Sequence, residues 1–216
     1  MEQLHGRYIV IEGPDGTGKT THAKLLTETL ASSGIKSRYV HEPGETPMGQ
    51  ELEKLIKNRD LIRSPTANFL LFTAARLEAY QQIIQPTLAT GGTVVSDRNW
   101  LSSVAYQGAA GRVGIERVYE ESRRWLPDTY MQPTFTILLH VPGAQRRQML
   151  TARATSEKDY FESKPSQFQK DLLKGYEAVE QLIIENGYAG CRISAEGSIQ
   201  DVHARIMEHL RQGGII

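Results

Sequence analysis

Short apolar runs recur along the chain and alternate with longer amphipathic segments. The runs are mostly continuous, which is typical of strands covered on both faces of a sheet. We predict five strands, at residues 8–11, 37–41, 93–96, 134–141 and 191–194. The run at 134–141 is the strongest of them, and those at 37–41 and 191–194 are weaker.

Between these runs, apolar residues repeat at the spacing of an α-helix. A helix is expected from about residue 66 to 88, with Phe72 and Arg76 on one face. Alternating strands and helices predict an α/β fold, in which a parallel sheet has helices on both faces. Three further stripes predict one helix each: Ala23, Leu26 and Leu30; Phe168, Leu172, Tyr176, Val179 and Ile183; and Ile199, Val202, Ile206 and Leu210.

Composition narrows the class of protein. A length of 216 residues suits a single domain, 1–216, and the formal net charge of +0 argues against an unspecific nucleic-acid binder. A local basic pocket for a small phosphate ligand stays compatible with that balance. One cysteine, Cys191, predicts a reducing compartment such as the cytoplasm. No apolar run approaches the ~20 residues of a membrane span, and residues 1–7 do not resemble a secretion signal.

Directly after the first expected strand, residues 13–20 read GPDGTGKT and match the G-x-x-x-x-G-K-[ST] phosphate loop. Glycines let backbone N–H groups converge on phosphate oxygens, and the following helix directs its positive end at the same anion. The lysine adds a charge for the transferring group, and the threonine hydroxyl suits Mg²⁺. A glycine-rich turn that binds nothing is the plainer alternative. The predicted ATP-binding residues are Gly13, Pro14, Asp15, Gly16, Thr17, Gly18, Lys19, Thr20 and Thr21.

Two charged residues follow the third expected strand. If the first and third strands are parallel neighbours, Asp97 lies beside the phosphate loop. At that position it can bind Mg²⁺ through water. Arg98 can hold a phosphate with two parallel hydrogen bonds. The alternative is an ordinary surface ion pair.

Four sequence blocks together resemble the thymidylate kinase family. They are residues 13–21 (GPDGTGKTT), 41–44 (HEPG), 71–76 (LFTAAR) and 97–108 (DRNWLSSVAYQG), within a resemblance that spans about residues 7–162. The resemblance implies a P-loop three-layer sandwich with five parallel strands. It also implies transfer of phosphate from ATP to dTMP with Mg²⁺, and a homodimer.

On the donor side, the resemblance implies that Lys19 and Thr20 hold the ATP phosphates and the metal. Asp97 would position the metal, and Glu42 would lie near the metal or its waters. Arg98 would clamp the acceptor phosphate. A solvated loop acid is the alternative for Glu42.

On the acceptor side, Asp15 would lie near the deoxyribose 3′-hydroxyl and the acceptor phosphate. Phe72 would stack on thymine, Arg76 would donate to its O4, and Tyr106 would crowd the 2′ position. The four-residue spacing of Phe72 and Arg76 supports a shared ligand independently. Plain packing is the alternative for Phe72 and Tyr106, and a surface pair for Arg76. Around the base would lie Gln107, with Ser102 or Ser103.

A mobile lid is expected at residues 146–163, where the apolar periodicity breaks and basic residues gather. Some family members carry an arginine at the position of Gly16, so here the lid should supply the cation, with Arg153 as first choice. Arg146, Arg147 and Lys158 remain alternatives. The chain departs from the family pattern at His41, Glu45, Thr155 and Tyr160, which leaves acceptor choice open.

We therefore predict an ATP- and Mg²⁺-dependent dTMP kinase. Transfer needs no strong base, because the acceptor phosphate is already anionic and positioning and electrostatics suffice. The residues predicted to act in catalysis are Lys19, Arg98, Arg153 and Asp15. Two alternatives stay open: a kinase of broader deoxynucleoside monophosphate range, and a P-loop ATPase or nucleotide-binding module without a small acceptor.

Overall fold

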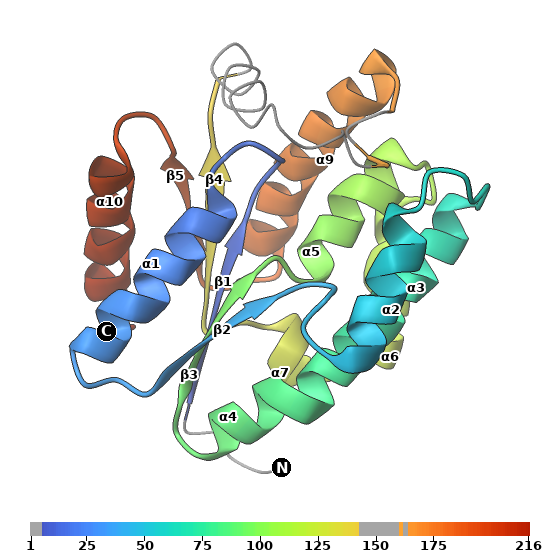
Figure 1. Cartoon of the computed structure of the whole chain (residues 1–216). Coiled ribbons are helices and arrows are strands. Elements are labelled where there is room, and N and C mark those ends of the chain that lie inside the picture. The colour runs from blue at the N-terminus through green and yellow to red at the C-terminus, as the bar shows by residue number, and fades with distance from the viewer. Residues whose placement is uncertain (1–5, 143–159, 162–163) are drawn as a thin grey trace.

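The computed structural model describes residues 6–142, 160–161 and 164–216. Five parallel strands form one sheet in the order β2-β3-β1-β4-β5, with β1 at its centre (Figure 1). This confirms the predicted α/β fold and all five predicted strands. The strands are β1 (Arg7–Glu12), β2 (Ser37–His41), β3 (Thr93–Asp97), β4 (Phe135–His140) and β5 (Gly190–Ser194).

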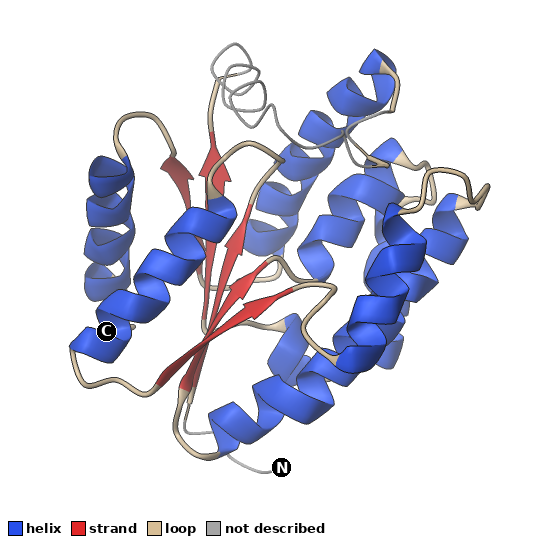
Figure 2. Ribbon diagram, viewed as in Figure 1, coloured by secondary structure: helices blue, strands red, loops and turns tan. Residues whose placement is uncertain are grey.

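Helices cover both faces of the sheet (Figure 2). On one face lie α1 (Lys19–Ser32) and α10 (Ile199–Gln212), and on the other lie α3 (Pro65–Ala79) and α9 (Ser166–Glu185). The remaining elements are α2 (Pro47–Lys57), η1 (Tyr80–Ile84), α4 (Gln85–Ala89), α5 (Trp100–Ser103), η2 (Val104–Ala110), α6 (Ile115–Trp125) and α7 (Asp128–Met131).

Alternate side chains of β1 pack into two separate hydrophobic cores, one on each face of the sheet. Ile9 and Ile11 pack with Leu26 of α1 and the residues of α10, whereas Tyr8 and Val10 pack against α3 and α9. Both cores exclude water from β1, which explains why its apolar run is continuous. Each fully buried aliphatic side chain contributes about 2 kcal/mol to folding.

The register of the sheet gathers polar residues at one edge. Ile11 of β1 and His41 of β2 both lie opposite Asp97 of β3. The carboxyl ends of these parallel strands therefore meet where the loop after β1 begins, which is the usual position of ligands in open α/β sheets.

The long helix expected at about 66–88 is present as a run of three elements, α3, η1 and α4, with a π-helical turn at Tyr80–Ile84. Of the expected lid at 146–163, only Tyr160 and Phe161 are described. Arg146, Arg147, Arg153 and Lys158 lie outside the described residues. Within the described ranges, no helix has the length and apolarity needed to cross a bilayer.

His22, on α1, is expected to make the folded protein sensitive to acid. Burial, followed by the charges of His203 and Arg205, lowers the pKa of His22 from 6.5 to about 4. Between these two values the unfolded chain takes up a proton that the folded chain does not, so the free energy of unfolding falls as the pH falls. His22→Asn should reduce this slope by up to about 1 kcal/mol per pH unit between pH 6.5 and 4. Urea unfolding at several pH values measures it, and parallel curves for variant and parent would contradict it.

Candidate active site

The phosphate loop joins β1 to α1, and three of its glycines are required by the backbone. Gly13 has φ 143°, Gly16 has φ 83° and Gly18 has φ 81°, all in the region that side chains disfavour. A Cβ at Gly13 would also lie 2.4 Å from the carbonyl oxygen of Leu139. Because α1 begins at Lys19, its unpaired N–H groups face the loop, as anion binding requires.

Lys19 is buried within this loop. Its Nζ donates to the carbonyl oxygen of Pro14 at 3.0 Å and lies 3.8 Å from Oδ1 of Asp15. Burial, followed by the charge of Arg98, lowers the pKa of Lys19 to about 8. The fold therefore holds a poorly solvated ammonium group at the point where bound phosphate anions would stabilise its charge.

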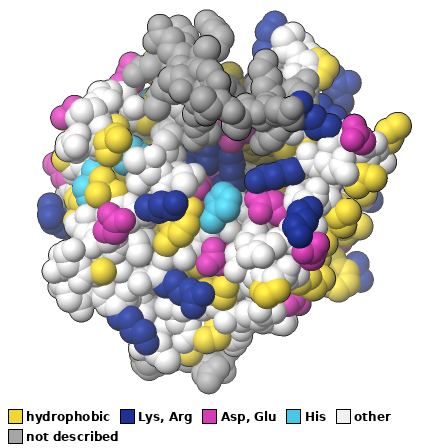
Figure 3. All heavy atoms as spheres, in the orientation of Figure 1, with side chains coloured by type: hydrophobic (Ala, Val, Ile, Leu, Met, Phe, Trp, Pro, Cys, Tyr) yellow, Lys and Arg dark blue, Asp and Glu magenta, His cyan; other side chains and the backbone are white. Residues whose placement is uncertain are grey.

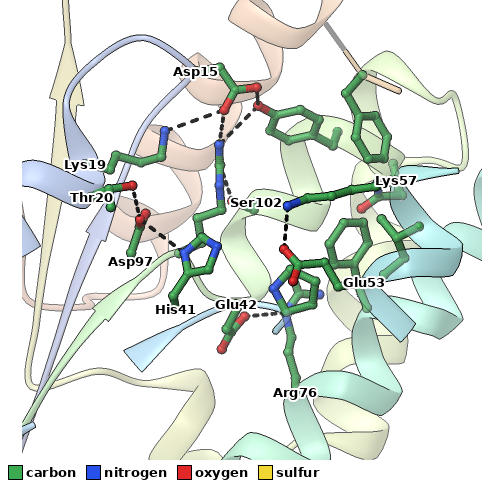
Figure 4. A pocket seen from close by; sticks show the side chains of 17 residues that line it. Asp15, Lys19, Thr20, His41, Glu42, Glu53, Lys57, Arg76, Asp97 and Ser102 are labelled. Carbon is green, nitrogen blue, oxygen red and sulfur yellow. Dashed lines mark hydrogen bonds and ion pairs between the residues drawn. The ribbon is translucent and has the colours of Figure 1, made fainter. Parts of the chain in front are cut away.

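Asp97 meets Thr20 and His41 at the edge of the sheet (Figure 4). Oδ2 of Asp97 accepts from the Thr20 hydroxyl and lies 3.3 Å from Nδ1 of His41, whereas the buried Oδ1 has no partner among the described residues. Burial raises the pKa of Asp97, but the hydrogen bond from His41 and the charges of Lys19 and Arg98 outweigh it and lower the pKa to about 2.

These oxygens fit a hard cation such as Mg²⁺, which prefers carboxylate, hydroxyl and phosphate oxygens. In the described part of the chain no three His, Cys, Asp or Glu side chains form a metal-binding cluster.

Arg98 faces the phosphate loop from the opposite wall. Its Nη2 pairs with Asp15, and its Nη1 lies 2.9 Å from the hydroxyl oxygen of Ser102 and 3.1 Å from that of Tyr176. Asp15 also accepts from the hydroxyl of Tyr106. The backbone of Arg98 is left-handed, with φ 78°, and its N–H donates to β1. Strain of this kind is typical of functional residues whose surroundings fix them.

Arg76 is almost fully buried and is held by hydrogen bonds to three residues. Its Nε donates to Oε2 of Glu42 at 3.0 Å, Nη1 to the hydroxyl of Ser103 at 2.7 Å, and Nη2 to the carbonyl of Asn99 at 2.9 Å. The guanidinium carbon lies 5.3 Å from the centroid of the Phe72 ring. The predicted pair is thus assembled as one unit with a fixed orientation.

Glu42 lies apart from Thr20 and Asp97, the residues expected to hold the metal. Its carboxylate is buried and accepts from Arg76 and from the hydroxyl of Tyr130, and Figure 4 shows it beside Arg76 rather than beside Thr20 and Asp97. Burial raises its pKa, while the charge of Arg76 opposes that rise. The role expected for Glu42 near the metal or its waters stays a prediction, and in this arrangement each of its oxygens accepts from one protein donor.

One cavity of ≈ 250 Å³ unites the two halves of the site. Phe72 and Arg76 line it together with Lys19, and the buried Nε2 of Gln107 lacks a partner among the described residues. Basic and acidic side chains lie close together at the centre of the surface in Figure 3. The other predicted residues that line the cavity are Asp15, Thr20, Glu42, Asp97, Arg98, Ser102 and Tyr106.

Ser103 lies behind Arg76 instead of lining the cavity. Sequence reasoning did not assign a role to several residues that complete the site. Glu12, which ends the first apolar run, is the clearest signal among them, because a charged residue in a buried strand needs partners. The others are Asn99, Tyr176 and four residues that line the cavity: Glu53, Ile56, Lys57 and Phe161.

Comparison with known proteins decides the family. The sequence profile named "Thymidylate kinase" matches residues 11–206. The chain belongs to the thymidylate kinase family. The "Thymidylate kinase" of Chromobacterium violaceum is 30% identical over 216 residues, covering 98% of this chain and 96% of the relative. That of Methylobacillus flagellatus is 36% identical over 174 residues (80% and 82%), and that of Synechococcus sp. is 34% identical over 199 residues (92% and 91%).

Proposed function

We propose that the chain transfers the γ-phosphoryl group of ATP to dTMP, forming dTDP for the synthesis of dTTP. One observation carries the proposal: Lys19 of the phosphate loop and the Phe72–Arg76 unit line the same cavity. A triphosphate on the loop and a pyrimidine on the Phe72 ring would then meet end to end. Family membership supports the same reaction.

The residues of the site would act by placing positive charge around the donor and acceptor phosphates. Lys19 and the N–H groups at the start of α1 would hold the donor phosphates, and Arg98 would hold the acceptor phosphate opposite them. An anionic acceptor oxygen attacks phosphorus in line, so no side chain has to remove a proton. Arg153 stays our proposal for a lid cation that neutralises the transferring group.

Mg²⁺ would be held by Thr20 and Asp97, whose buried Oδ1 has no hydrogen-bond partner among the described residues. When bound, the ion would neutralise charge on the donor phosphates. The carboxylate of Asp97 is suited to this task, because its lowered pKa keeps it ionised throughout the physiological range.

Base recognition follows from donor chemistry. The buried guanidinium of Arg76 and the unpartnered Nε2 of Gln107 both present N–H groups, which suit the carbonyl oxygens of thymine. Cytosine would place an amino group against donors, leaving buried polar groups unpaired. Tyr106, whose hydroxyl is tied to Asp15, would stand at the sugar and disfavour a 2′-hydroxyl.

An acceptor panel tests the proposal. We expect kcat/KM for dTMP to exceed that for dCMP by at least ~100-fold, because a site built to donate rejects an amino group strongly. Assays with dUMP and dGMP distinguish the broader kinase: an acceptor preferred over dTMP would overturn the substrate assignment. ATP turnover that needs no monophosphate would instead favour the ATPase.

We also propose that the protein is a cytoplasmic homodimer. Exposed apolar side chains gather on α2, α3 and the loop between them, and a second copy would cover them. Sedimentation at micromolar concentration tests the dimer. The side chains are Met48, Leu55, Leu61, Ile62 and Leu70.

A further inference from the structure

Glu12 is the last residue of β1 and is completely buried. Its Oε1 accepts from the backbone N–H groups of Asn99 at 2.9 Å and Ser102 at 3.1 Å, and its Oε2 accepts from that of Gly13 at 3.1 Å. Backbone N–H groups can only donate, so Glu12 acts here purely as an acceptor. It thereby ties the phosphate loop to the segment after β3.

Two hydroxyl groups complete this arrangement. Oγ of Ser102 lies 2.8 and 2.9 Å from the two oxygens of Glu12, and the hydroxyl of Tyr176 lies 3.2 Å from Oε2. Each hydroxyl carries a single proton, which it donates to Glu12. Each then offers lone pairs to Nη1 of Arg98, at 2.9 and 3.1 Å, which is a closer neighbour than the other hydroxyl, 3.5 Å away.

We propose that Glu12 is a positioning residue that orients Arg98 by fixing the direction of the Ser102 and Tyr176 hydroxyl protons. The inference rests on the proposed role of Arg98 in holding the acceptor phosphate. Oε2 of Glu12 lies 4.0 Å from Nη1 of Arg98, so its charge also favours the guanidinium at this place. Burial and the charge of Glu12 raise the pKa of Tyr176, so its hydroxyl keeps its proton.

Glu12→Gln tests the proposal with almost no change in shape. The amide nitrogen donates and cannot accept. Two backbone N–H groups point at Oε1 and one at Oε2, so the amide nitrogen should take the Oε2 position, where the hydroxyl of Tyr176 can no longer donate to residue 12. We expect the KM for dTMP to rise at least ~10-fold and the KM for ATP to change less than ~3-fold. The thermal unfolding midpoint should fall by several degrees, because the amide nitrogen faces at least one of the buried backbone N–H groups that donate to Glu12, so the comparison of the two KM values is made below that midpoint.

Tyr176→Phe provides a second test that leaves Glu12 in place. It removes one acceptor from Arg98 and should raise the KM for dTMP ~3- to 10-fold, and its effect should not multiply with that of Glu12→Gln, because both act through one contact. The matched control is Tyr8→Phe, which removes a hydroxyl from a tyrosine on β1 that packs on Tyr130, away from Arg98. That control should leave both KM values unchanged.

The results separate three situations. A parent enzyme that does not phosphorylate dTMP would refute the proposed function, before any variant is made. A parent that does so, with Glu12→Gln changing both KM values equally or neither, would overturn the positioning role alone. Should Glu12→Gln fail to fold, an unchanged KM for dTMP in both Tyr176→Phe and Ser102→Ala would overturn it equally.

Discussion

Lys19→Met is expected to lower kcat by about 1000-fold while the protein stays folded. The ammonium group is buried beside the phosphate loop, where a cation stabilises developing charge far more than it does in water. Methionine keeps the length and apolar stem of lysine but removes the charge. Because burial lowers the pKa of Lys19, the folded protein gains nothing in stability from this charge, and the unfolding midpoint of the variant should match or exceed that of the parent.

Steady-state kinetics with ATP and dTMP, together with thermal unfolding, measure both halves of this prediction. Lys36→Met is the matched control, because Lys36 is exposed and, among the described residues, its Nζ donates to the hydroxyl of Thr90 alone, at 3.3 Å. We expect its kcat to equal that of the parent. Retention of a tenth or more of the parent kcat by Lys19→Met would contradict the assignment of the phosphate loop.

Glu42→Gln should have the largest effect on stability, lowering the free energy of unfolding by about 3 kcal/mol. The carboxylate is buried between two donors, Arg76 and Tyr130, and the substitution leaves the charge of Arg76 without a counter-ion. An amide can accept from one of these donors but faces the other with its own N–H groups. The KM for dTMP should rise as well, because Arg76 loses a contact that orients it beside Phe72.

The double variant Glu42→Gln/Arg76→Met distinguishes a lost pair from a lost residue. It removes the uncompensated charge, so its stability should recover part of the loss seen in Glu42→Gln, while the KM for dTMP rises further and that for ATP changes little. The control is Glu51→Gln, which breaks an exposed pair with Lys54 and should cost less than ~0.5 kcal/mol. Additive stability losses in the double variant would argue against a buried pair.

The sequence predicts β1, β3 and β4 well because these strands are buried on both faces, whereas the edge strands β2 and β5 are partly exposed and have weaker runs. Residues 8–11, for example, are all apolar, so their composition alone predicts a buried strand. The helix α2 was not predicted, although Thr46 caps it and Pro47 begins it. Its apolar side chains repeat at helical spacing, but Met48 and Leu55 are exposed and Ile56 alone among its large apolar side chains is buried, so the stripe belongs to neither core. Local pattern predicts elements that fill a core better than those that line a site.

Within the site, the sequence identifies the residues better than their partners. The motifs predict that Lys19 and the Phe72–Arg76 pair belong together, and the cavity contains all three. The pairing of Glu42 with Arg76 joins positions 34 residues apart and leaves no local signal. Ser102 and Ser103 are adjacent, yet one contacts Arg98 and the other Arg76, because neighbours on a helix point in directions about 100° apart.

The cations of the cavity already have anionic partners within the protein. Arg98 pairs with Asp15, and Lys57 pairs with Glu53 at 2.6 Å. When a phosphate enters the cavity, these cations exchange their carboxylate partners for the phosphate. The net gain in affinity is therefore smaller than it would be for cations without partners. The departing product in turn leaves behind carboxylates that resume these contacts. Pre-paired charge of this kind favours rapid turnover over tight retention of nucleotide.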